Sequence, residues 1–151
     1  MHKLFLFSAG ALALAGCDFA GGTADATAPI ASLQVTGLPA TAETDGSTPD
    51  VFFEIQDASG RSYYRSAVAD NAAWTGSSEA AISGAVEIPS SRMPLQISVY
   101  DFDNTLNEST LMARSTRFTS DEIAASAELS LASADAASAA RFTVTRGSAS
   151  E

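Results

Sequence analysis

The chain has 151 residues and a formal net charge of −10, from 8 Lys and Arg against 18 Asp and Glu. This length supports one domain rather than two. The only His is His2, the only Lys is Lys3 and the only Cys is Cys17. Residues 18–151 therefore cannot build a Ser–His–Asp triad, a Cys–His pair, a Schiff-base lysine or a His/Cys zinc site. An acidic chain also repels nucleic-acid phosphates, so DNA or RNA binding is not expected.

The first 16 residues have the pattern of a secretory signal peptide. A short positive segment, His2 and Lys3, precedes an apolar run of eleven residues, 4–14. Such a run is too short to cross a hydrocarbon core of about 30 Å as a helix, but its length is typical of a signal peptide.

The sequence Leu14-Ala15-Gly16-Cys17 follows the apolar run and resembles the lipobox of bacterial lipoproteins. The resemblance implies that a diacylglycerol is attached to the Cys17 sulfur, that the chain is cleaved before Cys17 and that the new amino group is acylated. Two or more acyl chains anchor a protein stably to a membrane. The alternative is an ordinary signal peptide with a cysteine near its cleavage site. We expect a lipid-anchored protein of the bacterial cell envelope, at the outer or inner membrane, on the periplasmic side or the surface.

The composition divides the chain into successive segments. Residues 1–16 are the expected lipoprotein signal peptide, and residues 17–29 contain the lipidated cysteine and a small, polar, flexible tether. Residues 30–146 are expected to form the folded domain, followed by a disordered tail at residues 147–151. At about 5–6 Å × √n, the tether keeps the domain within on the order of 20 Å of the lipid surface.

Alternating apolar and polar residues dominate the folded domain and predict β-strands. The alternation is carried by short runs at residues 33–35, 51–56, 86–88, 95–100, 129–131 and 142–144. The sequence Asp57-Ala58-Ser59-Gly60 predicts a hairpin turn with glycine in the left-handed region, leading to a third strand that carries Arg61 and Arg65. Seven or eight strands over about 120 residues predict an all-β fold, an antiparallel β-sandwich.

One short helix is expected between the strands. Thr119 and Glu122 have the spacing of a capping box, and the apolar sequence Ile123-Ala124-Ala125 follows. We therefore predict one or two helical turns near Thr119–Ala125. Residues 132–140 have helical propensity, but Ser and Asp interrupt them and no large apolar residue is present, so a loop is favoured over a helix.

Three segments together resemble a C2 domain, the calcium-dependent phospholipid-binding β-sandwich. Residues 45–53 (DGSTPDVFF) are similar to the family's first calcium loop and the strand that follows it. The sequence Asn71-Ala72-Ala73-Trp74 resembles the family's Asn-Pro-x-Trp segment without its proline, and residues 99–108 (VYDFDNTLNE) are similar to the third calcium loop. The resemblance covers roughly residues 30–146 and implies a C2-like sandwich.

The same resemblance implies a Ca²⁺ site formed by five acidic residues: Asp45, Asp50, Asp101, Asp103 and Glu108. Calcium takes six to eight oxygen ligands, so several carboxylates must converge on it. Alternation along a strand sends Asp101 and Asp103 to the same face, with Phe102 opposite. The alternative is that these acids are solvated loop residues of an acidic protein.

Residues 99–106 also resemble the first motif of haloacid dehalogenase-type phosphohydrolases, in which Asp-x-Asp-x-Thr follows an apolar strand. The resemblance implies that Asp101 is the nucleophile and Asp103 the acid/base, beside Mg²⁺. That motif should open a parallel α/β domain, whereas the chain after Thr105 is short, contains no Lys and shows no alternation of strands and helices. We therefore expect no enzyme.

Two functions remain open at this point. The first is an envelope-anchored lipoprotein whose C2-like module binds Ca²⁺ and acts in binding or adhesion at the membrane surface. The alternative is a metal-independent structural β-sandwich lipoprotein that docks to an envelope protein complex. The expected partners are the membrane, reached through the Cys17 lipid, and either phospholipid head groups or an envelope protein.

Overall fold

A computed structural model describes residues 30–39, 48–69, 74–83, 86, 90–103 and 108–147. Cys17 and Asp45 lie outside the described residues, as do the predicted signal peptide, the tether and most of the predicted tail. Among the described residues, no helix is long and apolar enough to span a membrane.

The described chain consists mainly of strands. In chain order the elements are β1 (Ile30–Thr36), β2 (Val51–Asp57), β3 (Ser62–Arg65), β4 (Ser78–Ala81), the 3₁₀-helix η1 (Ser90–Arg92), β5 (Leu95–Asp103), β6 (Glu108–Arg114), α1 (Ser120–Ala125), β7 (Glu128–Ala132) and β8 (Arg141–Arg146).

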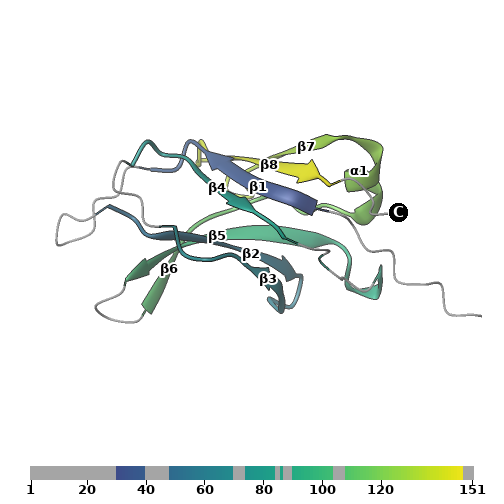
Figure 1. The fold of residues 1–151 in the computed structure, drawn as a ribbon, viewed down its shortest axis with the longest axis horizontal. Coiled ribbons are helices and arrows are strands. Elements are labelled where there is room, and N and C mark those ends of the chain that lie inside the picture. Colours follow the sequence, from purple (N-terminus) through teal and green to yellow (C-terminus); the bar gives the residue numbers. More distant parts are fainter. Residues whose placement is uncertain are drawn as a thin grey trace, which may run out of the picture.

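The strands form two four-stranded sheets, one in the order β4-β1-β8-β7 and the other in the order β3-β2-β5-β6. Every paired strand runs antiparallel to its neighbour. Figure 1 shows the two sheets as layers, with α1 at one end of the sandwich. The predicted antiparallel β-sandwich of seven to eight strands is confirmed. The two sheets pack together because each has one apolar face that the other sheet covers.

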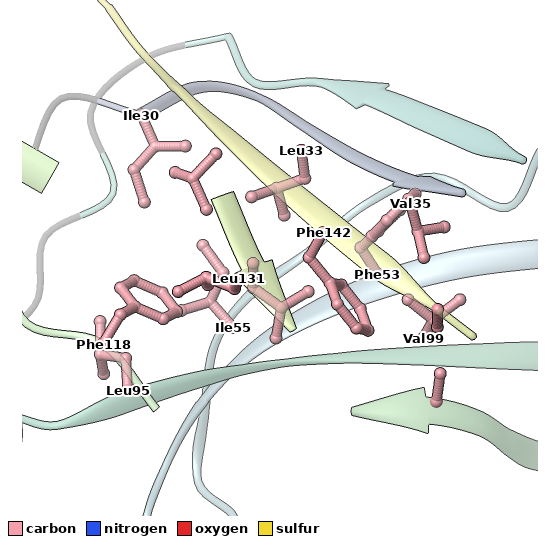
Figure 2. Packing of buried hydrophobic residues seen from close by; sticks show 14 of the residues in the cluster. Ile30, Leu33, Val35, Phe53, Ile55, Leu95, Val99, Phe118, Leu131 and Phe142 are labelled. Atoms are coloured by element: carbon pink, nitrogen blue, oxygen red, sulfur yellow. The ribbon is translucent and has the colours of Figure 1, made fainter. Parts of the chain in front are cut away.

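The core lies between the two sheets. Leu33, Val35 and Phe142 extend from one sheet toward Phe53 and Val99 of the other (Figure 2). These side chains are at most 1 % exposed. Burial of one large apolar side chain contributes about 1.5–3 kcal/mol, so this shared core holds the sheets together.

Strand β2 departs from simple alternation, because it is buried on both faces. Phe52 lies on the face away from the core and is still only 2 % exposed. The Tyr100 ring stacks on Phe52 with 5.2 Å between centroids, and the Phe102 ring meets its edge at 6.5 Å. The Arg65 guanidinium lies over the Phe52 ring, 3.9 Å from its centroid. Neighbouring strands thus bury a residue that alternation alone would leave on an open face.

The sequence pattern missed strands β4 and β6. Strand β4 (SEAA) contains no large apolar residue, and pairing with β1 holds it in the sheet. Glu108, which the loop interpretation placed in the third calcium loop, is the first residue of β6. Of the predicted strand at residues 86–88, Val86 is buried and the other two residues lie outside the described part of the chain.

The short helix and the loop after β7 agree with the predictions. Thr119 is the N-cap of α1; its side chain accepts from the Glu122 N–H, and the Glu122 carboxylate accepts from the Thr119 N–H at 2.7 Å. This capping box satisfies two N–H groups that an isolated helix end would leave unpaired. Residues 133–140 form turns and irregular backbone rather than a helix.

Asp57 organises the turn between β2 and β3. Its Oδ1 accepts from the Ser59 N–H at 2.8 Å, the Ser59 hydroxyl at 2.5 Å and the Arg61 N–H at 3.1 Å, and its Oδ2 accepts from the Tyr63 hydroxyl at 3.0 Å. Gly60 adopts φ = 83°, as the predicted hairpin turn requires. The bonds from Ser59, chiefly that of its hydroxyl, lower the pKa of Asp57 to about 2 despite the opposing effect of burial.

Replacing Asp57 with Asn should lower the stability of the protein at neutral pH and make its stability depend less on pH in the acid range. An Asp in an unfolded chain titrates near pKa ~3.9. The ionised form therefore stabilises the fold above that pH, and the stabilisation is lost as the pH falls from about 4 to about 2. Urea unfolding midpoints measured across this range should show that loss in the wild type and less of it in Asp57→Asn. The exposed loop residue Asp135 provides the control, since Asp135→Asn should keep the wild-type profile; the same profile in Asp57→Asn would refute the assignment.

Candidate functional site

Four of the five predicted calcium ligands lie at one end of the β3-β2-β5-β6 sheet. Asp50 immediately precedes β2, Asp101 and Asp103 lie in the last three residues of β5, and Glu108 begins β6. The pairing of Val51 with Asp101 brings the start of β2 to the end of β5. We call this group of residues, Asp50, Asp101, Asp103 and Glu108, the acidic end of the sandwich.

Asp50 and Asp101 are joined directly. The Asp50 N–H donates to Asp101 Oδ1 at 3.0 Å, and the Phe102 N–H donates to the Asp50 carbonyl at 2.8 Å. Asp101 follows the inward-facing Ile97 and Val99 along β5, but it is half-buried rather than buried because the apolar core ends before it. The backbone therefore holds one carboxylate at the margin of the core.

Asp103 and Glu108 form the second half of the acidic end. They are direct partners in the β5–β6 pairing, and Asp101 is paired with Thr110 two positions along the ladder. Partners across antiparallel strands point to the same face, so Asp101, Asp103 and Glu108 share one side of the sheet. Phe102 lies on the other side, against Phe52.

The acidic end is arranged as two pairs rather than as one closed cluster. Within the residues that the structure describes, no three His, Cys, Asp or Glu side chains gather closely enough to hold a metal ion. The fifth predicted ligand, Asp45, is outside those residues, as are residues 104–107 of the predicted third loop.

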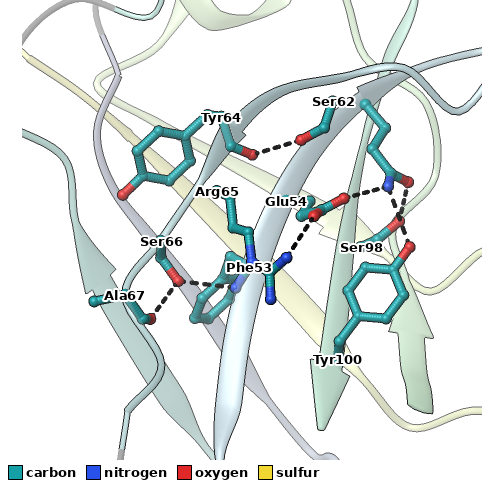
Figure 3. A network of polar contacts seen from close by, with 10 residues as sticks. Phe53, Glu54, Ser62, Tyr64, Arg65, Ser66, Ala67, Ser98 and Tyr100 are labelled. Atoms are coloured by element: carbon teal, nitrogen blue, oxygen red, sulfur yellow. Dashed lines mark hydrogen bonds and ion pairs between the residues drawn. The ribbon is translucent and has the colours of Figure 1, made fainter. Parts of the chain in front are cut away.

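A polar network on the outer face of the same sheet was not predicted (Figure 3). Gln56 Nε2 donates to Glu54 at 2.5 Å and to the Tyr100 hydroxyl at 3.1 Å, while the Ser98 hydroxyl donates to Gln56 Oε1 at 2.8 Å. Arg65 lies 3.9 Å from the Glu54 carboxylate. Polar residues at every second position of β2 and β5 were the available signal, but only the strand register shows that they meet.

Trp74 belongs to the segment that resembles the Asn-Pro-x-Trp motif. It is half-buried and packs against the core. Its indole Nε1 is buried without a hydrogen-bond partner. Residues 71–73 of this motif lie outside the described chain, so the rest of the resemblance stays a prediction.

The phosphohydrolase motif has a different structural setting from the one its chemistry needs. Strand β5 leads into the antiparallel β6, whereas that family requires a crossover to a parallel strand. The described residues of this motif, 99–103, therefore lie in an antiparallel sheet.

Comparison with known proteins finds likeness in structure but none in sequence. No protein-family model matches the chain, and no curated protein sequence matches it. A solved structure described as "BON1-C2B" is similar, with a TM-score of 0.49 and 12 % sequence identity over 76 % of this chain and 85 % of that chain.

Replacing Glu108 with Gln should stabilise the cation-free protein. Like charges directly opposite each other on neighbouring strands are destabilising, by an amount within the usual range of about 0.2–1 kcal/mol for such pairs. Chemical unfolding in EDTA at low salt should show the gain, and salt should reduce it by screening. Glu128→Gln is the matched control, because Glu128 also begins a strand but is paired with the neutral Thr145. Equal effects of both substitutions would show that Asp103 and Glu108 do not repel each other.

Proposed function

We propose that this chain is a lipid-anchored envelope protein whose C2-like β-sandwich binds Ca²⁺ at the acidic end and acts in binding or adhesion at the membrane surface. The observation that carries the proposal is the convergence of Asp50, Asp101, Asp103 and Glu108 on one end of one sheet. These residues come from the ends of three strands, and the register of β2, β5 and β6 brings them together.

The chemistry of the donor set supports a hard cation. Calcium prefers six to eight oxygen ligands at about 2.3–2.6 Å, and the acidic end offers only carboxylate and backbone oxygens. Because no three of the described carboxylates lie close enough together to hold a metal ion, the proposal requires a cation to draw them together and to recruit Asp45. Such a site has the character of extracellular calcium modules, which bind in the range of about 10⁻⁴–10⁻³ M.

Calcium binding should be measurable as heat and as added stability. Titration of the full chain with CaCl₂ should release or absorb heat, and the melting temperature should rise when Ca²⁺ exceeds the dissociation constant. Asp101→Asn/Asp103→Asn should abolish both effects. Asn keeps an oxygen that can accept the Asp50 N–H, so loss of binding would not reflect loss of that backbone bond.

A control variant removes the same two negative charges at positions away from the acidic end. Asp121→Asn/Asp135→Asn changes two exposed carboxylates on α1 and in the loop after β7, and it should bind Ca²⁺ as the wild type does. Absence of both heat and stabilisation in the wild type at several times the expected dissociation constant would overturn the calcium proposal. It would favour the second candidate, a metal-independent sandwich that docks to an envelope protein.

The lipid anchor is proposed on the lipobox resemblance alone. Cys17→Ser removes the sulfur to which a diacylglycerol would be attached, so the protein should lose the mass of its lipid and leave the membrane fraction. Mass spectrometry and fractionation of a bacterial host that expresses the full chain provide the measurement. Cys17→Ala is expected to behave in the same way, and an unchanged membrane fraction in both variants would contradict the lipobox.

The proposed role is non-catalytic. Residues 18–151 contain no His, Lys or Cys that could act as base, Schiff-base amine or thiolate. The proposed partners are the membrane, reached through the Cys17 lipid, and either phospholipid head groups or an envelope protein.

A further inference from the structure

The sandwich has a second end whose charge differs from that of the acidic end. Strand β2 pairs Asp57 with Leu95, so the β2–β3 turn and the start of β5 lie opposite the Val51–Asp101 end. Phe118 forms two backbone hydrogen bonds with Leu95, at 2.8 and 2.9 Å. Figure 2 places Ile30 on the side of the core where Phe118 and Leu95 lie, and Val35 on the side of Val99.

Four of the seven arginines that follow Cys17 lie at this second end. Arg61 ends the β2–β3 turn, Arg92 precedes β5, Arg117 adjoins Phe118, and Arg146 is paired with Ile30. All four side chains are exposed. We call the end defined by Ile30, Arg61, Arg92, Arg117 and Arg146 the basal end.

Two of these arginines, Arg61 and Arg92, influence the Tyr63 side chain electrostatically. The Arg61 guanidinium lies 5.6 Å from the ring centroid of Tyr63. Burial and the bond to Asp57 raise the pKa of Tyr63, and the charges of Arg92 and Arg61 oppose that rise. The Arg61 guanidinium therefore lies against Tyr63 at the basal end. Acidic residues near this end belong to the Asp57 turn, to α1 and to the first residue of β7.

The two ends are far apart on the scale of electrostatic screening. Six positions separate Leu95 from Asp101 along β5, which corresponds to about 20 Å at roughly 3.3 Å per residue. The Debye length is about 8 Å at physiological ionic strength. A charged surface in contact with one end therefore acts on that end and hardly on the other.

The length of the tether alone does not determine which end of the sandwich faces the membrane. Its reach, on the order of 20 Å, is similar to the length of the sandwich, so either end could meet the membrane that holds Cys17. The difference in charge does decide the orientation. The four arginines of the basal end offset its four nearby acidic residues, Asp57, Asp121, Glu122 and Glu128, whereas the four residues that define the acidic end are all carboxylates, which an anionic lipid surface repels.

We propose that the domain stands with its basal end on the anionic membrane surface to which Cys17 is attached, and that the acidic end faces away from it. This inference rests on the proposed anchor at Cys17. It means that whatever the acidic end binds approaches from the side opposite the anchoring membrane.

The single Trp provides a native probe of this orientation. Trp74 lies four residues before Ser78, which is paired with Val35 on the side of the acidic end. The full chain is held on vesicles through Cys17, by its own lipid or by reaction with a maleimide lipid, and energy transfer from Trp to a dansyl lipid is measured in EDTA. Trp74→Phe/Ala125→Trp moves the donor to α1, whose Ala124 carbonyl accepts from Arg146.

On vesicles containing phosphatidylglycerol, transfer from position 125 should be severalfold more efficient than from Trp74. The difference should shrink on neutral phosphatidylcholine and at high salt. Equal transfer from both positions on anionic vesicles, or stronger transfer from Trp74, would overturn the proposal.

A matched pair of arginine variants tests whether the arginines of the basal end cause this orientation. Arg92→Gln/Arg117→Gln should abolish the preference for anionic vesicles, whereas Arg114→Gln/Arg141→Gln removes the same charge away from the basal end and should retain it. Equal behaviour of the two variants would overturn the role of the basal arginines. Because coupling at Cys17 does not depend on cellular lipidation and EDTA excludes Ca²⁺, failure of this orientation is distinguishable from failure of the proposed anchor or calcium site.

Discussion

The pairing of β2 with β5 is the interaction on which the rest of the structure depends. Its inward positions, Phe53 opposite Val99 and Ile55 opposite Ile97, supply the centre of one face of the core. The same register brings Val51 opposite Asp101, which allows the Asp50 N–H to bond the Asp101 carboxylate. A slip of one residue would send the apolar set to the outer face and separate the acidic pair. Core packing and the geometry of the acidic end are therefore set by one ladder.

The outer face of this ladder explains how β2 can be buried on both sides without leaving polar groups unsatisfied. Ser98 is fully buried, and its hydroxyl donates to Gln56, which in turn donates to Glu54 and Tyr100. Buried polar groups are tolerated when they are bonded in this way. The network also orders the edge strand β3, because Arg65 reaches from β3 across the Phe52 ring toward Glu54. The outer side of the sheet that carries the acidic end is thus held by hydrogen bonds, an ion pair and a cation–π contact.

Charge is distributed unevenly along the sandwich. Carboxylates gather where β2, β5 and β6 meet, while exposed arginines gather around Ile30 and the start of β5. These residues are scattered along the chain, from Asp50 to Arg146, and antiparallel pairing brings them to opposite ends. A net charge alone, which makes the chain simply acidic, conceals this polarity. The separation matters because it exceeds the distance over which salt allows charges to act.

Local patterns in the sequence by themselves determined the all-β class, the Asp57 turn, the capping box at Thr119 and the strands with large alternating apolar residues. Each depends on neighbours within a few positions, where periodicity and turn chemistry are read directly. Strands β4 and β6 could not be predicted from the sequence. Strand β4 lacks large apolar residues, and both strands form through pairing with residues distant in the chain. The candidate site was half predictable: the sequence marked the acidic residues, but only the tertiary structure decided that Asp50 contacts Asp101 while Asp103 faces Glu108. The placement of four arginines at the end opposite those acids was likewise a tertiary outcome, since strand register, not sequence spacing, determines which distant residues become neighbours.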